Sequence, residues 1–215
     1  DLSSDISKLG GLYQRKKFIA GGFYWTPNTY EDKLAIYTSK KGVIFGYDTN
    51  YSGRIEHRSI RPRSGETFFS NLDANEVRNR TFTLVSGGVS FFKKRESLSN
   101  YYQILFTSRA PSIEDLFSDG PHLGNYAYEI GDPNLNQENT VGFENTLSLF
   151  NSTSSLNLTS YMNYSPNYHI STKMGDGYLP GAEWVEWGSG PIGWLYKYNL
   201  TGLEAMVYGF EPSLN

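Results

Sequence analysis

The sequence predicts an all-β fold in which long antiparallel strands form part of a transmembrane β-barrel. First, apolar and polar residues alternate along several segments of about ten residues or more, as in strands with one apolar and one wet face. Second, short and long connections follow each other in turn, which is typical of barrels with short turns on one side of a membrane and long loops on the other. Third, the chain has 17 Tyr and 22 Gly but only 38% hydrophobic and 19% charged residues, which fits a sheet with one polar face better than a packed globular core.

Composition also narrows the class of protein. The net charge of −3 gives no reason to expect nucleic acid as a partner. The chain has no Cys, so it uses neither disulfides nor thiolate metal sites. No apolar run approaches the roughly 18 residues of a membrane-spanning helix, so any crossing must be made by strands. Residues 1–9 lack a basic start followed by an apolar stretch, and we therefore expect no signal peptide there.

The N-terminal half is expected to form two hairpins. A first strand is predicted over residues 12–24 and a short return strand over 33–39, with a tight turn at 40–42. The alternation is clear from Val43 to Arg58. It assigns Val43, Phe45, Tyr47, Tyr51 and Ile55 to one face, and Gly46, Asp48, Asn50, Ser52, Arg54, Glu56 and Arg58 to the other. The return strand is predicted over 77–92, with a bulge at Gly87-Gly88 where the alternation changes parity.

The C-terminal half repeats the pattern. Strands are expected near residues 101–109, 140–150, 156–165 and 194–210, with Pro166 ending one of them and a change of parity around Gly202 in the last. Short connections at 93–99 and 151–155 alternate with long ones at 60–76, 109–138 and 171–193. In a barrel, the side chains that face lipid would be Phe45, Tyr47, Phe143, Leu147, Leu158 and Met162.

The connection from Ser108 to Glu138 is too elaborate for a hairpin turn, and the rest of the chain is organised around it. Pro111 cannot donate to a sheet ladder, so the incoming strand should stop at Arg109. Ser112 and Asp115 have the spacing of a capping box, which predicts one or two helical turns through Phe117.

Sequence boxes in this connection resemble those of the TonB-dependent outer-membrane receptor family. The family's R-A-P-S/N box, E-L-F/Y-like step and G-N/D-P-N-L-x-x-E box match Arg109-Ala110-Pro111-Ser112, Glu114-Asp115-Leu116-Phe117, and Gly131-Asp132-Pro133-Asn134-Leu135 with Glu138. Weaker likenesses, to flanking strands of the family, lie at Gly87-Gly88-Val89 with Tyr101 to Thr107, and at Tyr208-Gly209-Phe210-Glu211. All the boxes occur in order and at the family's spacing.

The resemblance implies that residues 1–215 are part of the receptor's barrel, supplying about eight of its roughly 22 strands in a Gram-negative outer membrane. It implies an active transporter, not an enzyme, which imports a scarce nutrient with energy from the TonB complex; no plug domain or TonB box is visible in the chain. The family's commonest cargo is an iron chelate, either a siderophore or haem, and no cofactor is expected to stay bound. Cobalamin, zinc and oligosaccharide remain open as cargo. A passive outer-membrane pore and a soluble β-sandwich that binds glycans are the alternative functions.

Candidate ligand-binding residues gather near the long connections. His57, His122 and His169 could bind a metal, although the alternative is three solvated histidines. The resemblance favours His122, because haem-uptake members of the family carry a histidine between the two main boxes.

Arginine and tryptophan side chains supply the other candidates. Arg58 and Arg109, with Arg54, Arg61 and Arg63 nearby, could hold an anionic chelate, or could instead pair with Asp48 and Glu56. Trp184 and Trp187 could stack on a ligand or belong to an interfacial girdle. The sequence contains no recognisable catalytic set.

Overall fold

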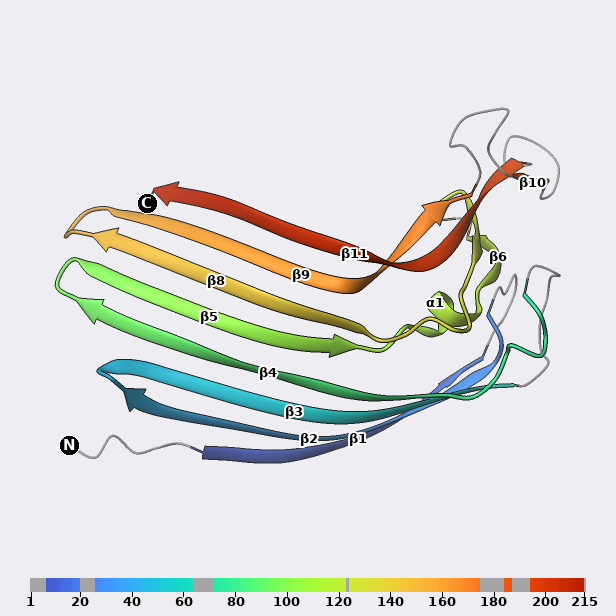
Figure 1. Cartoon of the computed structure of the whole chain (residues 1–215), viewed down its shortest axis with the longest axis horizontal. Coiled ribbons are helices and arrows are strands. Elements are labelled where there is room, and N and C mark those ends of the chain that lie inside the picture. Colours follow the sequence, from blue (N-terminus) through green and yellow to red (C-terminus); the bar gives the residue numbers. More distant parts are fainter. Residues whose placement is uncertain are drawn as a thin grey trace.

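In the part of the chain that the structure describes, the fold consists of one curved sheet of eleven strands and one short helix (Figure 1). The computed structural model describes residues 7–19, 26–63, 72–122, 124–174, 184–186 and 194–214. Eight strands in this part of the chain have twelve residues or more: β1 (Ser7–Phe18), β2 (Thr29–Ile44), β3 (Tyr47–Pro62), β4 (Arg80–Arg95), β5 (Leu98–Arg109), β8 (Glu138–Phe150), β9 (Ser155–Lys173) and β11 (Trp194–Leu214). The short elements are α1 (Ile113–Phe117), β6 (Asp119–His122), β7 (Ala127–Ile130) and β10 (Trp184–Glu186).

The long strands pair antiparallel with their neighbours, in the order β1-β2-β3-β4-β5-β8-β9-β11. The short strands β6 and β7 form a hairpin within the connection 109–138, and β7 pairs in parallel with the start of β11. This connection therefore returns to the sheet at its far side. It gathers with β10 at one end of the sheet, opposite the short turns (Figure 1).

The predicted turn at 40–42 is wrong, because β2 continues to Ile44 and the chain reverses at Phe45 and Gly46. Both turn residues have positive φ, 51° at Phe45 and 72° at Gly46, as a tight two-residue hairpin requires. Val43 consequently pairs with Asp48 and lies on the opposite face from Tyr47. The first strand also begins earlier than expected, at Ser7, and its partner is much longer than residues 33–39.

The predicted bulge at Gly87-Gly88 is also wrong, since the β3–β4 register runs unbroken from Asp48↔Phe92 to Ile60↔Arg80. The parity change predicted near Gly202 is confirmed by a register shift between Leu203 and Ala205. Strand β9 passes through Pro166 and ends at Lys173, contrary to the prediction. Pro166 lies opposite the shift, where the ladder is interrupted and its missing N–H costs nothing.

The two faces of the sheet differ in character. One face, here the outer face, carries a row of paired apolar residues that includes Ile36↔Ile55, Ile104↔Phe143 and Phe143↔Met162. These residues are 40 to 62% exposed, so no layer of the described part of the chain covers them. Tyr47, Leu147 and Leu158 lie on the same face by register, as predicted, whereas Phe45 is in the turn and 95% exposed.

The opposite, inner face carries the main hydrophobic core. Ile60, Phe82 and Leu84 of β3 and β4 pack there against the connection 109–138. A second cluster joins Leu72, Tyr128, Ile130 and Leu195. Among the described residues, no helix is long and apolar enough to cross a membrane.

Candidate functional site

The connection 109–138 begins with a capped helical turn. The Ser112 hydroxyl accepts a hydrogen bond from the Asp115 backbone N–H at 3.0 Å, and the Asp115 carboxylate accepts one from the Ser112 backbone N–H at 2.8 Å. This reciprocal pair is the predicted capping box. It aims three apolar side chains at the inner face of the sheet, where Ile113, Leu116 and Phe117 are at most 2% exposed.

The box around Gly131 closes onto the end of this helix. The Gly131 N–H donates to the Ser118 carbonyl at 2.7 Å, and the Asp132 N–H donates to the Asp115 carbonyl at 2.9 Å. A side chain at Gly131 would have no room, because its Cβ would lie 2.7 Å from the carbonyl carbon of Leu116. The box therefore needs glycine at this position for close approach of two backbones.

The residues after Gly131 are tied to β4. The Arg80 guanidinium donates to the carbonyl of Pro133 and, at 2.9 Å, to that of Leu135. The Asn134 N–H donates to the Asp132 carboxylate at 2.8 Å, and Leu135 is buried in the main core. The P-N-L part of the box is thus held by the turn at Asn134, by the hydrogen bonds from Arg80 and by the burial of Leu135.

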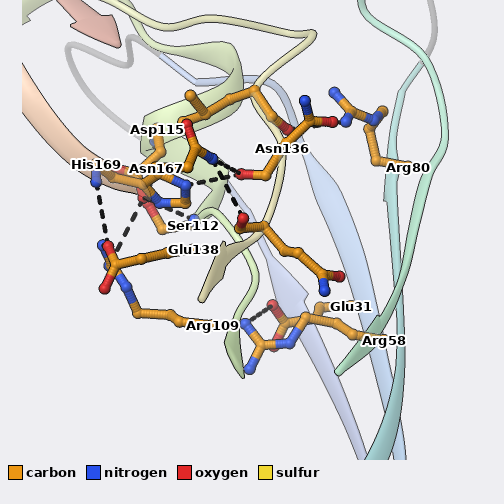
Figure 2. A network of polar contacts seen from close by, with 12 residues as sticks. Glu31, Arg58, Arg80, Arg109, Ser112, Asp115, Asn136, Glu138, Asn167 and His169 are labelled. Atoms are coloured by element: carbon orange, nitrogen blue, oxygen red, sulfur yellow. Dashed lines mark hydrogen bonds and ion pairs between the residues drawn. The ribbon is translucent and has the colours of Figure 1, made fainter. Parts of the chain in front are cut away.

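Arg109 and His169, both predicted ligand-binding residues, belong to a polar network around Glu138 (Figure 2). The Arg109 guanidinium donates to the Glu138 carboxylate at 2.8 Å, and the His169 backbone N–H donates to the same carboxylate at 3.1 Å. The His169 Nε2 lies 2.7 Å from the Asn136 carbonyl, and the ring is 1% exposed. Asn167 donates to the carbonyls of Asn136 and Gln137. These side chains secure the end of the loop at the tops of β5, β8 and β9.

Arg58 lies on the inner face among acids. Its guanidinium is 3.1 Å from Glu56 and 3.8 Å from Glu31, while Lys33 lies 3.1 Å from Glu31 and Arg54 lies 2.5 Å from Glu56. The pairing with Glu56 that the sequence left open is present. Arg61 lies one residue out of phase with Arg54 and Arg58 and pairs with Asp32 instead, so the arginines do not form one cluster.

The three histidines lie apart. His57 is exposed on the outer face, in register between Leu34 and Thr83. His122 lies in the β6–β7 hairpin, where its Nδ1 is 2.9 Å from the Glu129 carboxylate and its side chain is 34% exposed. The described residues contain no group of three or more His, Cys, Asp or Glu placed to hold a metal ion.

Of the predicted aromatic pair, Trp184 starts β10 and its backbone pairs with Tyr196. Trp187 lies outside the described residues.

The sequence did not predict the β6–β7 hairpin that carries His122. Asp119, which is 2% exposed, accepts the Tyr128 hydroxyl at 3.0 Å and the Leu72 N–H at 3.1 Å, and so joins the hairpin to the preceding long connection. The short alternation in Ala127-Tyr128-Glu129-Ile130 is the one signal that could have revealed the strand.

Comparisons with known proteins support the fold. No protein-family model matches the chain, and no curated protein matches it. Among solved structures, the fold is similar to that of the copper transporter OprC, with a TM-score of 0.63 and 14% identity over 89% of this chain and 27% of that chain. The siderophore receptor PirA from Pseudomonas aeruginosa is matched with a TM-score of 0.47 and 13% identity over 87% of this chain and 40% of that chain. The chain thus spans about a quarter of the copper transporter's length.

The predicted fold class is confirmed: the chain is an antiparallel, nearly all-β segment of a barrel wall. Its eight long strands match the number expected from the sequence. The soluble β-sandwich alternative needs a second sheet over the apolar face, whereas the described strands form one sheet.

Proposed function

We propose that this chain forms part of the wall of a TonB-dependent outer-membrane receptor that imports an iron chelate, either a siderophore or haem. One observation carries the proposal: a single curved sheet has an uncovered apolar outer face and holds the R-A-P-S and G-D-P-N-L boxes packed against its inner face. The fold likeness to a copper transporter supports metal import as the general activity. Outer-membrane lipid would cover the apolar face, and the TonB complex would supply energy to the whole receptor.

Growth on defined metal sources tests this proposal. A strain lacking the full-length gene is grown on a panel of sole iron sources, including siderophores and haem, and separately under copper limitation. Loss of growth on one iron chelate, restored by the intact gene and dependent on TonB, is the expected result. A growth defect under copper limitation alone would identify copper, and not iron, as the metal of the cargo. Uptake that continues without TonB would favour a passive pore.

Within this function, we propose that His122 binds the iron when the cargo is haem. A carboxylate bonded to one imidazole nitrogen orients the ring and raises its basicity as a ligand, and Glu129 lies in that position at 2.9 Å. His169 is less suited, because its ring is buried and held by the Asn136 carbonyl.

Substitution of His122→Ala should strongly reduce growth on haem, because the lost axial bond has no replacement. Glu129→Gln should weaken capture by about 10- to 100-fold, as loss of the residue supporting a metal ligand does. His57→Ala is the matched control, since His57 lies on the outer face away from the boxes, and it should leave growth unchanged. Normal haem use by the His122→Ala strain would remove His122 from the site and favour a siderophore as cargo.

A further inference from the structure

The sheet opens on one side of β4. The β4–β5 pairing ends at Gly87↔Phe106, although β3–β4 pairing continues to Ile60↔Arg80 and β5–β8 pairing continues to Arg109↔Glu138. The Ser108 N–H donates to the Ser86 hydroxyl at 3.2 Å and closes the lower end of the opening. Above it, residues 80–86 of β4 have a ladder partner on the β3 side only, within the part of the chain that the structure describes.

A pocket of about 590 Å³ occupies this opening. It lies between the upper part of β4, the segment that leads into β8, and β9. We call it the wall pocket; its polar lining comprises Thr81, Thr83, Asn136, Gln137, Asn139 and Asn167. A volume of this size is in the range of sites that bind small organic ligands.

Several polar groups of the wall pocket have no partner in the described part of the chain. The hydroxyls of Thr81 and Thr83 and the carboxamide of Asn136 make no hydrogen bond there. Asn167 donates through its Nδ2 to two backbone carbonyls, and its Oδ1 lies against Gly202, so this side chain is occupied in holding the pocket wall. Gln137 uses only its Nε2, which donates to the Asn139 Oδ1 at 3.3 Å. The pocket thus offers both donors and acceptors to a ligand.

The lining also limits the charge of that ligand. It contains no carboxylate that could attract a cation. Its one cation, Arg80, donates to the carbonyls of Pro133 and Leu135, which commits the guanidinium to holding the loop. Phe82, the one aromatic residue of the lining, is only 6% exposed, so the pocket presents little apolar surface.

We propose that the wall pocket binds an uncharged carbohydrate. A carboxamide presents one acceptor and two donors side by side, which matches neighbouring sugar hydroxyls, each of them both donor and acceptor. The pocket would hold one or two sugar rings. The sugar can come from a free saccharide or from the head of a glycolipid, because the pocket lies in the sheet wall between the outer and inner faces. This site is separate from His122 and does not depend on which metal chelate is imported.

Binding is tested on the full-length protein in nanodiscs made of phosphatidylcholine, which carry no sugar. Saturation-transfer NMR is recorded with D-glucose, N-acetyl-D-glucosamine and maltose. The expected result is transfer to at least one of these sugars, reduced about tenfold or more in the double variant Thr83→Ala/Asn136→Ala. Neither side chain bonds to the described protein, so the barrel should stay folded, which heat-modifiable mobility on gels verifies. Asn50→Ala is the matched control, since Asn50 is exposed near the short turns, and it should bind as the parent does.

A second arm identifies the source of the sugar. Hydrogen exchange over residues 80–83 and 136–139 is compared in nanodiscs with and without a glucosyl diacylglycerol. Slower exchange with the glycolipid, absent in the double variant, together with no transfer to free sugars, assigns the site to a lipid head. Transfer to a free sugar that depends on the two side chains assigns it to soluble saccharides. If neither arm distinguishes the double variant from the parent, the proposal is overturned.

Discussion

Replacing Gly131 by alanine should loosen the connection 109–138 without unfolding the sheet. The added Cβ would lie 2.7 Å from both the carbonyl carbon of Leu116 and the amide nitrogen of Phe117. Ordinary contacts of this kind begin at 3.4 Å, so the two backbones must separate by about 0.7 Å (3.4 − 2.7). Overpacking of this kind costs about 1 to 3 kcal/mol. The separation of the backbones should weaken the two hydrogen bonds that close the box, from the Gly131 N–H to Ser118 and from the Asp132 N–H to Asp115.

Hydrogen exchange of the Asp132 amide measures this loosening. If the local opening free energy falls by about 1 to 3 kcal/mol, exchange should speed up by about 5- to 150-fold, since each 1.4 kcal/mol is a factor of ten. Gly53→Ala is the control, because a Cβ at Gly53 meets nothing within 4 Å. Unchanged exchange at Asp132 in the Gly131→Ala protein, or an equal change in the control, would refute the close-approach argument.

Two further substitutions probe the cap and the outer face. Ser112→Ala removes the cap of α1 and should lower the local stability of the helix by about 0.5 to 2 kcal/mol. Hydrogen exchange of the Leu116 amide should therefore become faster. An unchanged exchange rate would mean that packing in the core alone holds the helix. Phe143→Arg places a charge on the apolar outer face and should cost about 2 to 4 kcal/mol of folding free energy in bilayers, as for arginine at a membrane midplane. Asn163→Arg on the inner face should cost much less, and equal costs in urea titrations of the two variants would contradict the lipid-facing assignment.

The loop boxes were predictable because their physics is local. A capping box depends on two side chains three residues apart, and Ser112 with Asp115 forms one wherever the chain permits a helical turn. The long strands were predictable because alternation over ten or more residues survives small errors at the ends. Thus the paired residues Leu147 and Leu158 lie on the face assigned to them.

The failures concern features that pairing partners decide. Lys40-Lys41-Gly42 has turn composition, but β3 pairs with β2 through Ile44, and the turn falls where Gly46 can follow Phe45 with positive φ. The strand β7 has four residues and is held by its pairing with β6 on one side and β11 on the other. The face of His57 follows from the alternation, since His57 has the parity of Ile55, whereas the places of His122 and His169 depend on the β6–β7 hairpin and on the pairing of β9 with β11.

Two of the residues that the sequence predicted to bind ligand, Arg109 and His169, hold the end of the loop instead. Arg109 bonds to Glu138 at 2.8 Å and lies 4.0 Å from Asp115, so Arg109→Ala should leave Glu138 with only the His169 N–H and speed up hydrogen exchange at Asp132 even without ligand. His122→Ala, by contrast, should leave that exchange unchanged and reduce only the use of haem, because His122 bonds to Glu129 and Asn125 within the hairpin. Arg61→Ala is the matched arginine control, since it breaks an ion pair with Asp32 on the outer face. If Arg109→Ala instead lowered chelate binding while exchange at Asp132 stayed as in the parent protein, Arg109 would contact the ligand, and Glu138 would need another partner to hold the end of the loop.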